Sequence, residues 1–239
     1  MNNISLIIPV FNEENNILNL YTEIQNIFIN KNNYEIIFVD DGSTDKSKDV
    51  LLNLEHKKKI RLIINKKNHG QSYSISKGIN ISSFQNIVTL DGDGQNNPKD
   101  ILKLLEVYFS KKDFSLVGGI RKNRKDSLLK ILSSKIANKI RSIILNDDCI
   151  DTGCSLKVFD KNIFLSFPFF NGLHRFLPAL FKGYGKNTFF LEVDHRPRIS
   201  GISKYGTFDR LFKGVTDMIR VKKIIRTYKL RNKDINNVF

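Results

Sequence analysis

The sequence predicts an α/β fold in which a mainly parallel central sheet is flanked by helices and followed by C-terminal amphipathic helices. Two observations lead to this fold class. Short apolar runs alternate with helical stretches through the first half of the chain, and polar clusters follow directly after several of those runs. Near-continuous apolar strands separated by helices are typical of a parallel sheet covered on both faces. Such sheets bind ligands at the carboxyl ends of their strands, which is where the polar clusters should meet.

The elements of the first half are predicted from apolar runs that end at turn residues. Strands are expected over residues 4–10, 34–39, 60–64 and 86–90. Helices are expected over residues 14–29, from about Asp45, and after Gly70. Short runs rich in Ile, Val and Phe are typical of buried strands. The polar clusters then follow the first, second and fourth of these strands.

The second half carries two helical stretches with basic residues between their apolar positions. The stretch over residues 128–145 is apolar at Leu128, Leu132, Ile136, Ile140 and Ile144. The tail repeats this spacing and is expected to present one apolar face, made of Leu211, Phe212, Val215, Met218, Ile219 and Ile225. Strands are expected over residues 156–159 and 188–193. We therefore expect one domain over residues 1–206 and a basic amphipathic tail over residues 207–239.

The composition predicts a folded protein of the cytoplasm. Hydrophobic residues make up 41% and charged residues 26% of the 239 residues, which is ordinary for a globular domain. Cys149 and Cys154 are too few for a disulfide framework and predict reduced thiols. No secretory leader is evident after Met1, and no apolar run approaches the roughly 20 residues that span a bilayer. We expect the protein to be cytoplasmic and peripheral on the cytoplasmic face of the membrane.

The net charge of +15 is concentrated in two basic stretches. Residues 196–233 hold twelve Lys and Arg against two Asp, and residues 121–141 hold eight against one. Such stretches attract the phosphates of nucleic acid, of anionic lipid or of a nucleotide ligand. The tail favours an anionic membrane surface as partner, whereas the helix over 127–145 fits a membrane and a core position equally well. A nucleic-acid-binding protein is a rival interpretation, but neither a recognised module nor an aromatic stacking platform supports it.

The clearest chemical motif is Asp91-Gly92-Asp93-Gly94-Gln95, which follows an apolar strand. Two carboxylates on alternate residues beyond a strand end can reach one hard divalent cation, and the glycines let the backbone turn tightly. Gln95 can add an oxygen ligand. A Mg²⁺ or Mn²⁺ ion held in this way keeps open positions for phosphate oxygens. An Asp/Gly-rich turn without a metal is the alternative.

Two further motifs follow the first two strands. The second strand leads into Asp40-Asp41-Gly42-Ser43-Thr44-Asp45, and the first leads into Pro9-Val10-Phe11-Asn12-Glu13. An acidic residue at a strand end can accept hydrogen bonds from a nucleoside, which suits Asp40. Thr44 and Asp45 are suited to capping the next helix.

These three motifs, in this order, resemble the nucleotide-binding half of family 2 glycosyltransferases with the GT-A fold. The resemblance implies that Pro9, Phe11, Glu13 and Asp40 contact the nucleoside of a nucleotide-sugar donor. It also implies that Asp91, Asp93 and Gln95 hold a metal on the diphosphate, with Gly92 and Arg198 in the same donor site.

The C-terminal half is similar to the dolichol-phosphate and polyprenyl-phosphate sugar transferases. The matching segments are Asp151-Thr152-Gly153-Cys154, residues 171–178, and residues 193–205 with the letters VDHRPRISGISKY. The resemblance implies an inverting enzyme with a polyprenyl-phosphate acceptor, with mannose favoured and GDP-mannose or a UDP-sugar as donor. The relatives' membrane-spanning C-terminal extension is not seen, so surface helices or a membrane-protein partner would provide membrane residence.

The mechanism must stabilise the negative charge that develops when a nucleoside diphosphate leaves the sugar. Asp93 acts through the metal, and Arg121, Arg196, Arg198 and Lys204 are candidates to clamp the donor and acceptor phosphates. A lipid phosphate is already anionic and can attack without a general base. The alternative acceptor, a saccharide hydroxyl, needs a carboxylate base, for which Asp151 or Asp194 is the candidate. His174 and His195 are expected to have structural roles.

Overall fold

The computed structural model describes residues 3–29, 33–110, 113–122, 138–197 and 207–236, with side chains described over 214–231 in the last range. The strands are β1 Ile4–Val10, β2 Tyr34–Asp40, β3 Ile60–Ile64, β4 Asn86–Thr89, β5 Phe114–Lys122, β6 Lys157–Asp160 and β7 Asn187–Asp194. The helices are α1 Ile17–Ile27, α2 Ser47–Glu55, α3 Gln71–Ile81, α4 Asp100–Ser110, α6 Lys161–Leu165, η1 Leu173–Arg175, α7 Leu177–Gly183 and α8 Thr207–Asn236. A further helix covers residues 138–145.

The seven described strands form one sheet in the order β3-β2-β1-β4-β6-β5-β7. Strands β1 to β4 are parallel, β5 is parallel to β7, and β6 runs antiparallel to its neighbours β4 and β5. The predicted α/β fold with a mainly parallel sheet is therefore confirmed. Strand β5 was not predicted from the sequence, because the adjacent Gly118 and Gly119 interrupt its apolar run.

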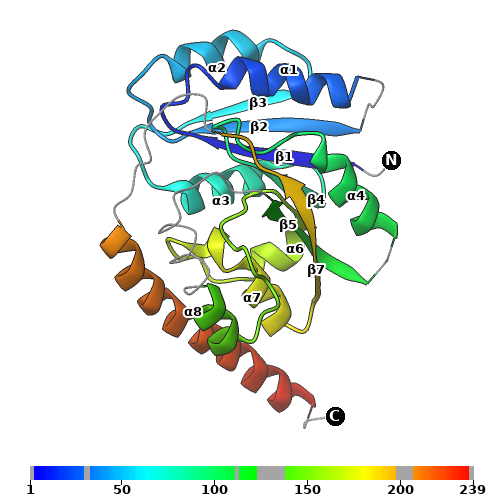
Figure 1. Ribbon diagram of the computed structural model, residues 1–239, viewed down its shortest axis with the longest axis vertical. Helices are drawn as coiled ribbons and strands as arrows, with labels where there is room; N and C mark the ends of the chain where they lie inside the picture. Colours follow the sequence, from blue (N-terminus) through cyan, green and yellow to red (C-terminus); the bar gives the residue numbers. More distant parts are fainter. Residues whose placement is uncertain (1–2, 30–32, 111–112, 123–137, 198–206, 237–239) are drawn as a thin grey trace.

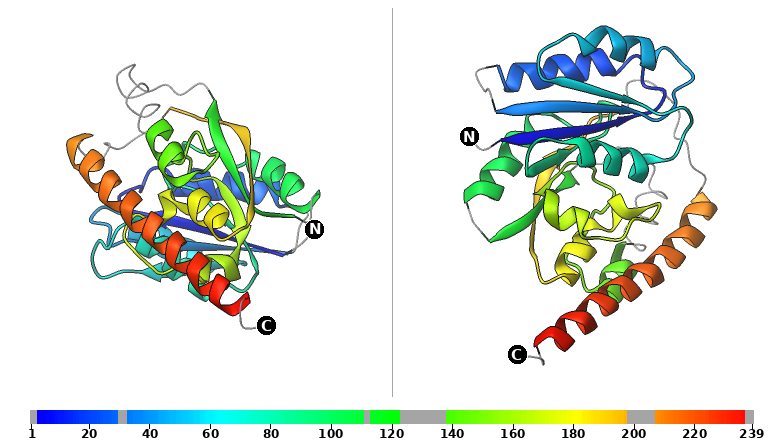
Figure 2. Two further views of the ribbon diagram at one scale, coloured as in Figure 1. Left: turned by 90° about the horizontal axis from the view of Figure 1, so that it is seen from below. Right: turned by 180° about the vertical axis from the view of Figure 1, so that it is seen from behind.

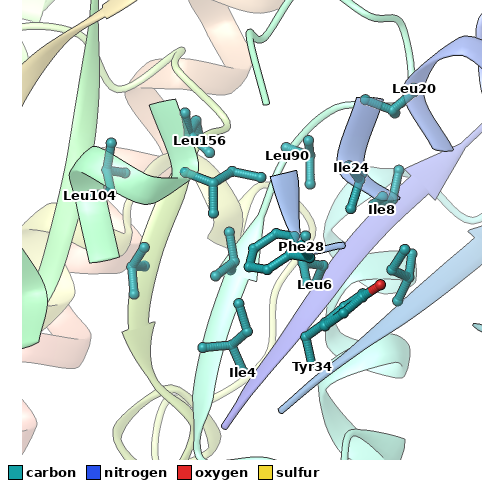
Figure 3. Packing of buried hydrophobic residues seen from close by; sticks show 14 of the residues in the cluster. Ile4, Leu6, Ile8, Leu20, Ile24, Phe28, Tyr34, Leu90, Leu104 and Leu156 are labelled. Carbon is teal, nitrogen blue, oxygen red and sulfur yellow. The ribbon is translucent and has the colours of Figure 1, made fainter. Parts of the chain in front are cut away.

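Helices cover both faces of the sheet (Figure 1). One core lies between the sheet and α1, α2 and α4, where Ile17, Leu20 and Ile24 of α1 are buried at helical spacing. Figure 3 shows this core, in which the rings of Phe28 and Tyr34 stack with centroids 4.8 Å apart. The second core lies on the opposite face, under α3, α6, α7 and α8. The two layers hold the strands rigidly, so the loops at their carboxyl ends start from fixed positions.

Helix α8 packs against the second core through α7. Met218 and Val221 are buried there, and the rings of Tyr228 and Tyr184 stack with centroids 3.7 Å apart. The apolar positions predicted for the tail are buried only in part, because Val215 and Ile219 are 52% and 66% exposed. At 100° per residue these two positions lie on the side of the helix opposite Val221.

The helix predicted over residues 127–145 is described only from residue 138 onward. Its predicted apolar positions Ile140 and Ile144 are 48% and 39% exposed, so they do not face the core. Arg141 and Leu145 are buried in their place. The predicted positions Leu128, Leu132 and Ile136 lie outside the described residues. No helix in the described part of the chain is long and apolar enough to cross a membrane.

Candidate active site

The first two polar motifs meet at the carboxyl ends of β1 and β2. The backbone N–H of Asp41 donates to the carbonyl of Val10 over 2.8 Å. The N–H of Asn12 donates to Ser43 Oγ over 2.9 Å, and the N–H of Glu13 donates to Ser47 Oγ over 2.8 Å. The sequence prediction that these motifs lie together at one edge of the sheet is confirmed.

The two adjacent aspartates after β2 have different surroundings. Asp40 is buried and accepts a hydrogen bond from the N–H of Ser43. Asp41 accepts from the backbone N–H of His69 and of Gly70, at 3.0 and 2.7 Å, so its carboxylate holds the connection between β3 and α3. Asp40 is therefore the member of the pair that is left for a nucleoside, and that role stays a prediction.

Gly42 brings the same connection close to the second motif. Its φ is +72°, and a Cβ there would lie 2.5 Å from the carbonyl carbon of Lys67. Any side chain at this position would push the two loops apart.

The other residues predicted to contact the nucleoside lie along the same edge. Glu13 is buried and accepts from Asn16 Nδ2 over 2.7 Å. Pro9 pairs with Val39 in the sheet, and Phe11 follows at the half-buried start of the loop. A Cβ on Gly92 would lie 3.0 Å from the Pro9 carbonyl oxygen, so the third motif packs closely on the end of β1.

The Asp91–Gln95 loop is held by one hydrogen bond from α3 and by two local ones. Gln71 Nε2, at the start of α3, donates to Asp91 Oδ1 over 2.7 Å. The N–H of Asp91 donates to Asn96 Oδ1 over 3.2 Å, and the N–H of Gln95 donates to Asp93 Oδ1 over 3.1 Å. Gln71 and Asn96 were not found from the sequence. The only signal for Gln71 is its place directly after the turn glycine that precedes a helix.

The pKa of Asp91 is raised to about 6, first by burial and then by the nearby carboxylate of Asp93. A hydrogen bond with Ser155 and the positive charges of Lys157 and Arg121 lower this pKa. Two crowded carboxylates at a buried site fit a divalent cation, which would relieve their mutual repulsion.

The described residues contain no group of three or more His, Cys, Asp or Glu side chains that could hold a metal ion. The protein ligands expected for Mg²⁺ or Mn²⁺ are then Asp91 and Asp93, with phosphate oxygens and water completing the sphere. Gln95 Nε2 donates to the Arg196 carbonyl over 3.2 Å, so Oε1 is the atom that Gln95 can offer.

Arg121, at the end of β5, forms a forked ion pair with Asp151. Its Nε and Nη2 donate to the two carboxylate oxygens over 2.8 and 2.7 Å, and its backbone N–H also donates to Asp151 over 3.1 Å. Burial opposes the charge of Arg121, but the Asp151 carboxylate outweighs it and raises the pKa of the guanidinium. A Cβ on Gly153 would lie 2.6 Å from Arg121 Nη2. The Asp151–Cys154 motif therefore positions the Arg121 side chain, through the carboxylate of Asp151 and the space left by Gly153.

Arg196 lies beside the Asp91–Gln95 loop and contacts α1. Its Nη1 donates to both carboxylate oxygens of Glu23 at 2.8 Å, and its Nη2 donates to Asn97 Oδ1 over 2.9 Å. Its backbone N–H donates to the Gln95 carbonyl over 2.9 Å. Arg196 thus connects α1 to the Asp91–Gln95 loop, and its role as a phosphate clamp stays a prediction. Arg198 and Lys204 lie outside the described residues.

His174 lies half-buried beside α3, in agreement with the structural role expected for it. Ser72 Oγ accepts from the N–H of Gly172 and of His174, so its own hydrogen is left to donate to His174 Nδ1 over 2.6 Å. Burial, with the charges of Arg175 and Lys157, lowers the pKa of His174 to about 3. The ring is neutral at physiological pH.

A mainly parallel sheet with a two-aspartate glycine loop at its carboxyl edge defines the GT-A class of nucleotide-diphospho-sugar transferase folds. The model of glycosyl transferase family 2 matches residues 5–166, and the chain belongs to that family.

Two curated relatives are similar over most of this chain. One is the dodecaprenyl-phosphate galacturonate synthase of Rhizobium johnstonii, 34% identical over 95% of this chain and 68% of the relative. Another is the undecaprenyl-phosphate 4-deoxy-4-formamido-L-arabinose transferase of Aeromonas hydrophila, 32% identical over 85% of this chain and 63% of the relative. The chain thus spans about two thirds of the length of these relatives.

The fold is also similar to a solved structure of glucosyl-3-phosphoglycerate synthase from Mycobacterium tuberculosis in complex with Mn²⁺, UDP and phosphoglyceric acid. The TM-score is 0.69 at 14% identity, covering 92% of this chain and 77% of the other. At this identity the likeness shows a shared GT-A fold.

Proposed function

We propose that this protein is an inverting glycosyltransferase that transfers a sugar from a nucleotide-sugar to a polyprenyl phosphate. The observation that carries the proposal is the arrangement of Asp91 and Asp93 near the Arg121–Asp151 ion pair. The names of both curated relatives describe sugar transfer to a polyprenyl phosphate, which supports the acceptor class.

The ion pair also favours a phosphate acceptor over a saccharide hydroxyl. A hydroxyl acceptor needs a carboxylate base, and both oxygens of Asp151 already accept hydrogen bonds from Arg121. Asp194, the other candidate base, is exposed and accepts from Asn97 Nδ2 over 3.3 Å. A lipid phosphate needs no base, because it is anionic at neutral pH.

In the proposed reaction, an oxygen of the acceptor phosphate forms a bond to the anomeric carbon of the sugar. The bond from that carbon to the diphosphate breaks on the opposite side, which inverts the anomeric centre. Asp91 and Asp93 would hold a Mg²⁺ or Mn²⁺ ion, which when bound would neutralise the charge of the leaving diphosphate. Arg121 adds a fixed positive charge beside them, since it contributes to the electrostatic surroundings of Asp91.

The sequence resemblance and the curated relatives differ on the donor sugar. Sequence resemblance alone favours mannose, but the relatives' names specify galacturonate and 4-deoxy-4-formamido-L-arabinose. These relatives do not support mannose, so the proposed donor is a nucleotide-sugar whose sugar is determined by experiment. We place the reaction at the cytoplasmic face of a membrane, because the acceptor is a membrane lipid, with a membrane-protein partner as part of the same hypothesis.

The test is transfer of label from a panel of nucleotide-sugars to undecaprenyl phosphate, with Mn²⁺ or Mg²⁺ present. The panel includes GDP-mannose and UDP-sugars. We expect metal-dependent label in the lipid phase, lost at least a hundredfold in Asp93→Ala, because removing a metal ligand removes the charge stabilisation of the leaving group. Asp49→Ala, at an exposed position of α2, is the matched control and should keep full activity.

Two results would contradict the proposal. If a nucleotide-sugar binds but labels only a saccharide, the acceptor class is wrong. If no nucleotide-sugar binds at all, the transferase assignment itself fails for this chain.

A further inference from the structure

The helix over residues 138–145 and the loop after it expose four isoleucines. Ile140, Ile143, Ile144 and Ile150 are 48%, 73%, 39% and 66% exposed. The first three lie within one 100° arc of the helix, since residues three and four apart share a face. An isolated exposed isoleucine is ordinary, but a cluster of this kind marks an interaction surface.

The opposite side of this helix is anchored in the protein, so the isoleucines are turned outward by the fold. Arg141 is buried, and its Nη2 donates to Asp147 Oδ1 over 3.0 Å and to the Cys149 carbonyl. Leu145 is buried in the second core.

The outward side of α8 is strongly basic. Its exposed cations in the described range are Arg220, Lys222, Lys223, Arg226, Lys229 and Arg231. The acidic residue of this range, Asp217, is buried. Val215, Ile219 and Leu230 are exposed between the cations, so this side alternates apolar and positively charged side chains. Long Lys and Arg side chains on such a face can keep their charges at lipid headgroups while apolar neighbours insert.

Helix α7 joins the two features into one surface. Lys182 at its C-terminal end donates to Asp148 Oδ2 over 2.6 Å, within the loop that carries Ile150. Tyr184, one residue after α7, stacks on Tyr228 of α8. The 138–145 helix, green in Figures 1 and 2, lies beside α8 in each view.

We propose that these isoleucines and the outward side of α8 form one membrane-binding surface for an anionic phospholipid bilayer. The inference rests on the proposed function, because it supplies the contact through which a lipid acceptor would be reached. The charge selects the partner: six exposed cations complement lipid phosphates, and the isoleucines require an apolar phase into which they can insert. The phosphate backbone of a nucleic acid would leave the isoleucines in water.

The surface is also connected to the active site. Asp217 of α8 lies 3.7 Å from Arg175 Nη2, in the segment that Ser72 fastens to the start of α3. The preceding residue, Gln71 at the start of α3, donates a hydrogen bond to Asp91. A bilayer on this surface is therefore linked, through α8, η1 and the start of α3, to the Asp91–Gln95 loop.

The role of the exposed cations of α8 is tested by flotation of the full chain with vesicles, in the absence of nucleotide-sugar and of acceptor. We expect at least tenfold stronger partition to vesicles of phosphatidylglycerol and phosphatidylcholine than to phosphatidylcholine alone. Lys222→Glu with Lys223→Glu should remove most of this preference. Lys57→Glu with Lys58→Glu, an exposed lysine pair after α2, makes the same charge change elsewhere and should keep it.

The apolar contact is tested by Ile143→Glu, at a position 73% exposed, against Ile29→Glu, at a position 77% exposed on the far side of the sheet. We expect about tenfold weaker partition to anionic vesicles for the first variant and no change for the second. Equal partition to both kinds of vesicle, or equal behaviour of the two isoleucine variants, overturns the proposal. A concentration-dependent dimer that Ile143→Glu abolishes also overturns it, because the surface would then bind a second copy.

Failure of this proposal is distinguishable from failure of the proposed function. Transfer to a short, water-soluble isoprenyl phosphate should be unchanged in every surface variant, because none of them touches the Asp91 site. Vesicle binding without transfer to any polyprenyl phosphate would leave the membrane surface standing and remove the acceptor assignment.

Discussion

At the scale of single residues, Asp91 and Asp93 form a site that is costly to leave without a counter-charge. Burial and mutual repulsion oppose ionisation of Asp91, and the positive charges of Lys157 and Arg121 only partly offset them. A divalent ion would supply the missing positive charge. Its binding therefore competes with protonation of Asp91.

This competition predicts a pH dependence of metal affinity. The pKa of Asp91 is raised to about 6, so the carboxylate is ionised above that pH and protonated below it. We expect the Mn²⁺ affinity to be nearly constant above pH 7 and to fall about tenfold for each pH unit below 6, because one proton must leave. Titration with Mn²⁺, followed by electron paramagnetic resonance, measures this affinity at each pH. Asp49→Asn is the control variant and should behave like the unchanged protein. A constant affinity from pH 5 to 7.5 would contradict this prediction.

The roles of acidic residues after strands could be predicted only in part. The sequence places Asp40, Asp41, Asp91 and Asp93 at one sheet edge, and the structure agrees. It does not separate Asp41 from the others, because the backbone N–H groups that Asp41 binds belong to residues 69 and 70. The contacts of Arg196 were missed for the same reason, since Glu23 is far away in the chain. Motifs of adjacent residues can be recognised from sequence, whereas partners brought together by folding cannot.

At the scale of elements, Arg196 fastens the segment after β7 to α1. The pair with Glu23 is about one third exposed on the Arg196 side, so its contribution to stability should be modest. The position of this ion pair matters more than its strength, because the Arg196 backbone N–H donates to the carbonyl of Gln95 in the Asp91–Gln95 loop.

A double-mutant cycle tests this structural assignment of Arg196. We expect Glu23→Gln and Arg196→Gln each to weaken Mn²⁺–nucleotide affinity by less than about fivefold, with the double variant no weaker than either. The effects should not add, because each variant breaks the same contact. Calorimetric titration measures the affinities. A loss in Arg196→Gln far above that in Glu23→Gln would favour the predicted phosphate clamp instead.

The two basic helices show how far periodicity can be used. Helical spacing predicted α8 correctly as a helix, and its start at Thr207 coincides with the start of the predicted tail. The apolar positions of α8 nevertheless differ in burial, with Met218 and Val221 buried and Val215 and Ile219 exposed. A hydrophobic pattern indicates which residues favour an apolar environment. Whether such a residue lies in the core or contacts another apolar phase depends on the elements that pack beside it.

At the scale of the whole molecule, the second core joins the active-site edge to the C-terminal helices. Ser72 of α3 and His174 of η1 meet inside it, more than a hundred positions apart in the chain. A neutral imidazole is required there, because a charged one would lose the Ser72 hydrogen bond and remain buried near Arg175 and Lys157.

The lowered pKa of His174 predicts how stability responds to acid. Its pKa is lowered from 6.5 in the unfolded chain to about 3 in the fold, so the unfolded state binds a proton first. Its stabilising effect is complete above pH 6.5, and we expect the free energy of unfolding to fall by about 1.4 kcal/mol for each pH unit between 6.5 and 3. Urea unfolding at pH 7.5 and 5 measures this change in the free energy of unfolding.

His174→Gln should be less stable at pH 7.5 but lose less stability on acidification, whereas the exposed control His56→Gln should keep the full loss. Equal losses in both variants would mean that other groups set the acid response, and that the link between α3 and η1 does not depend on a neutral ring.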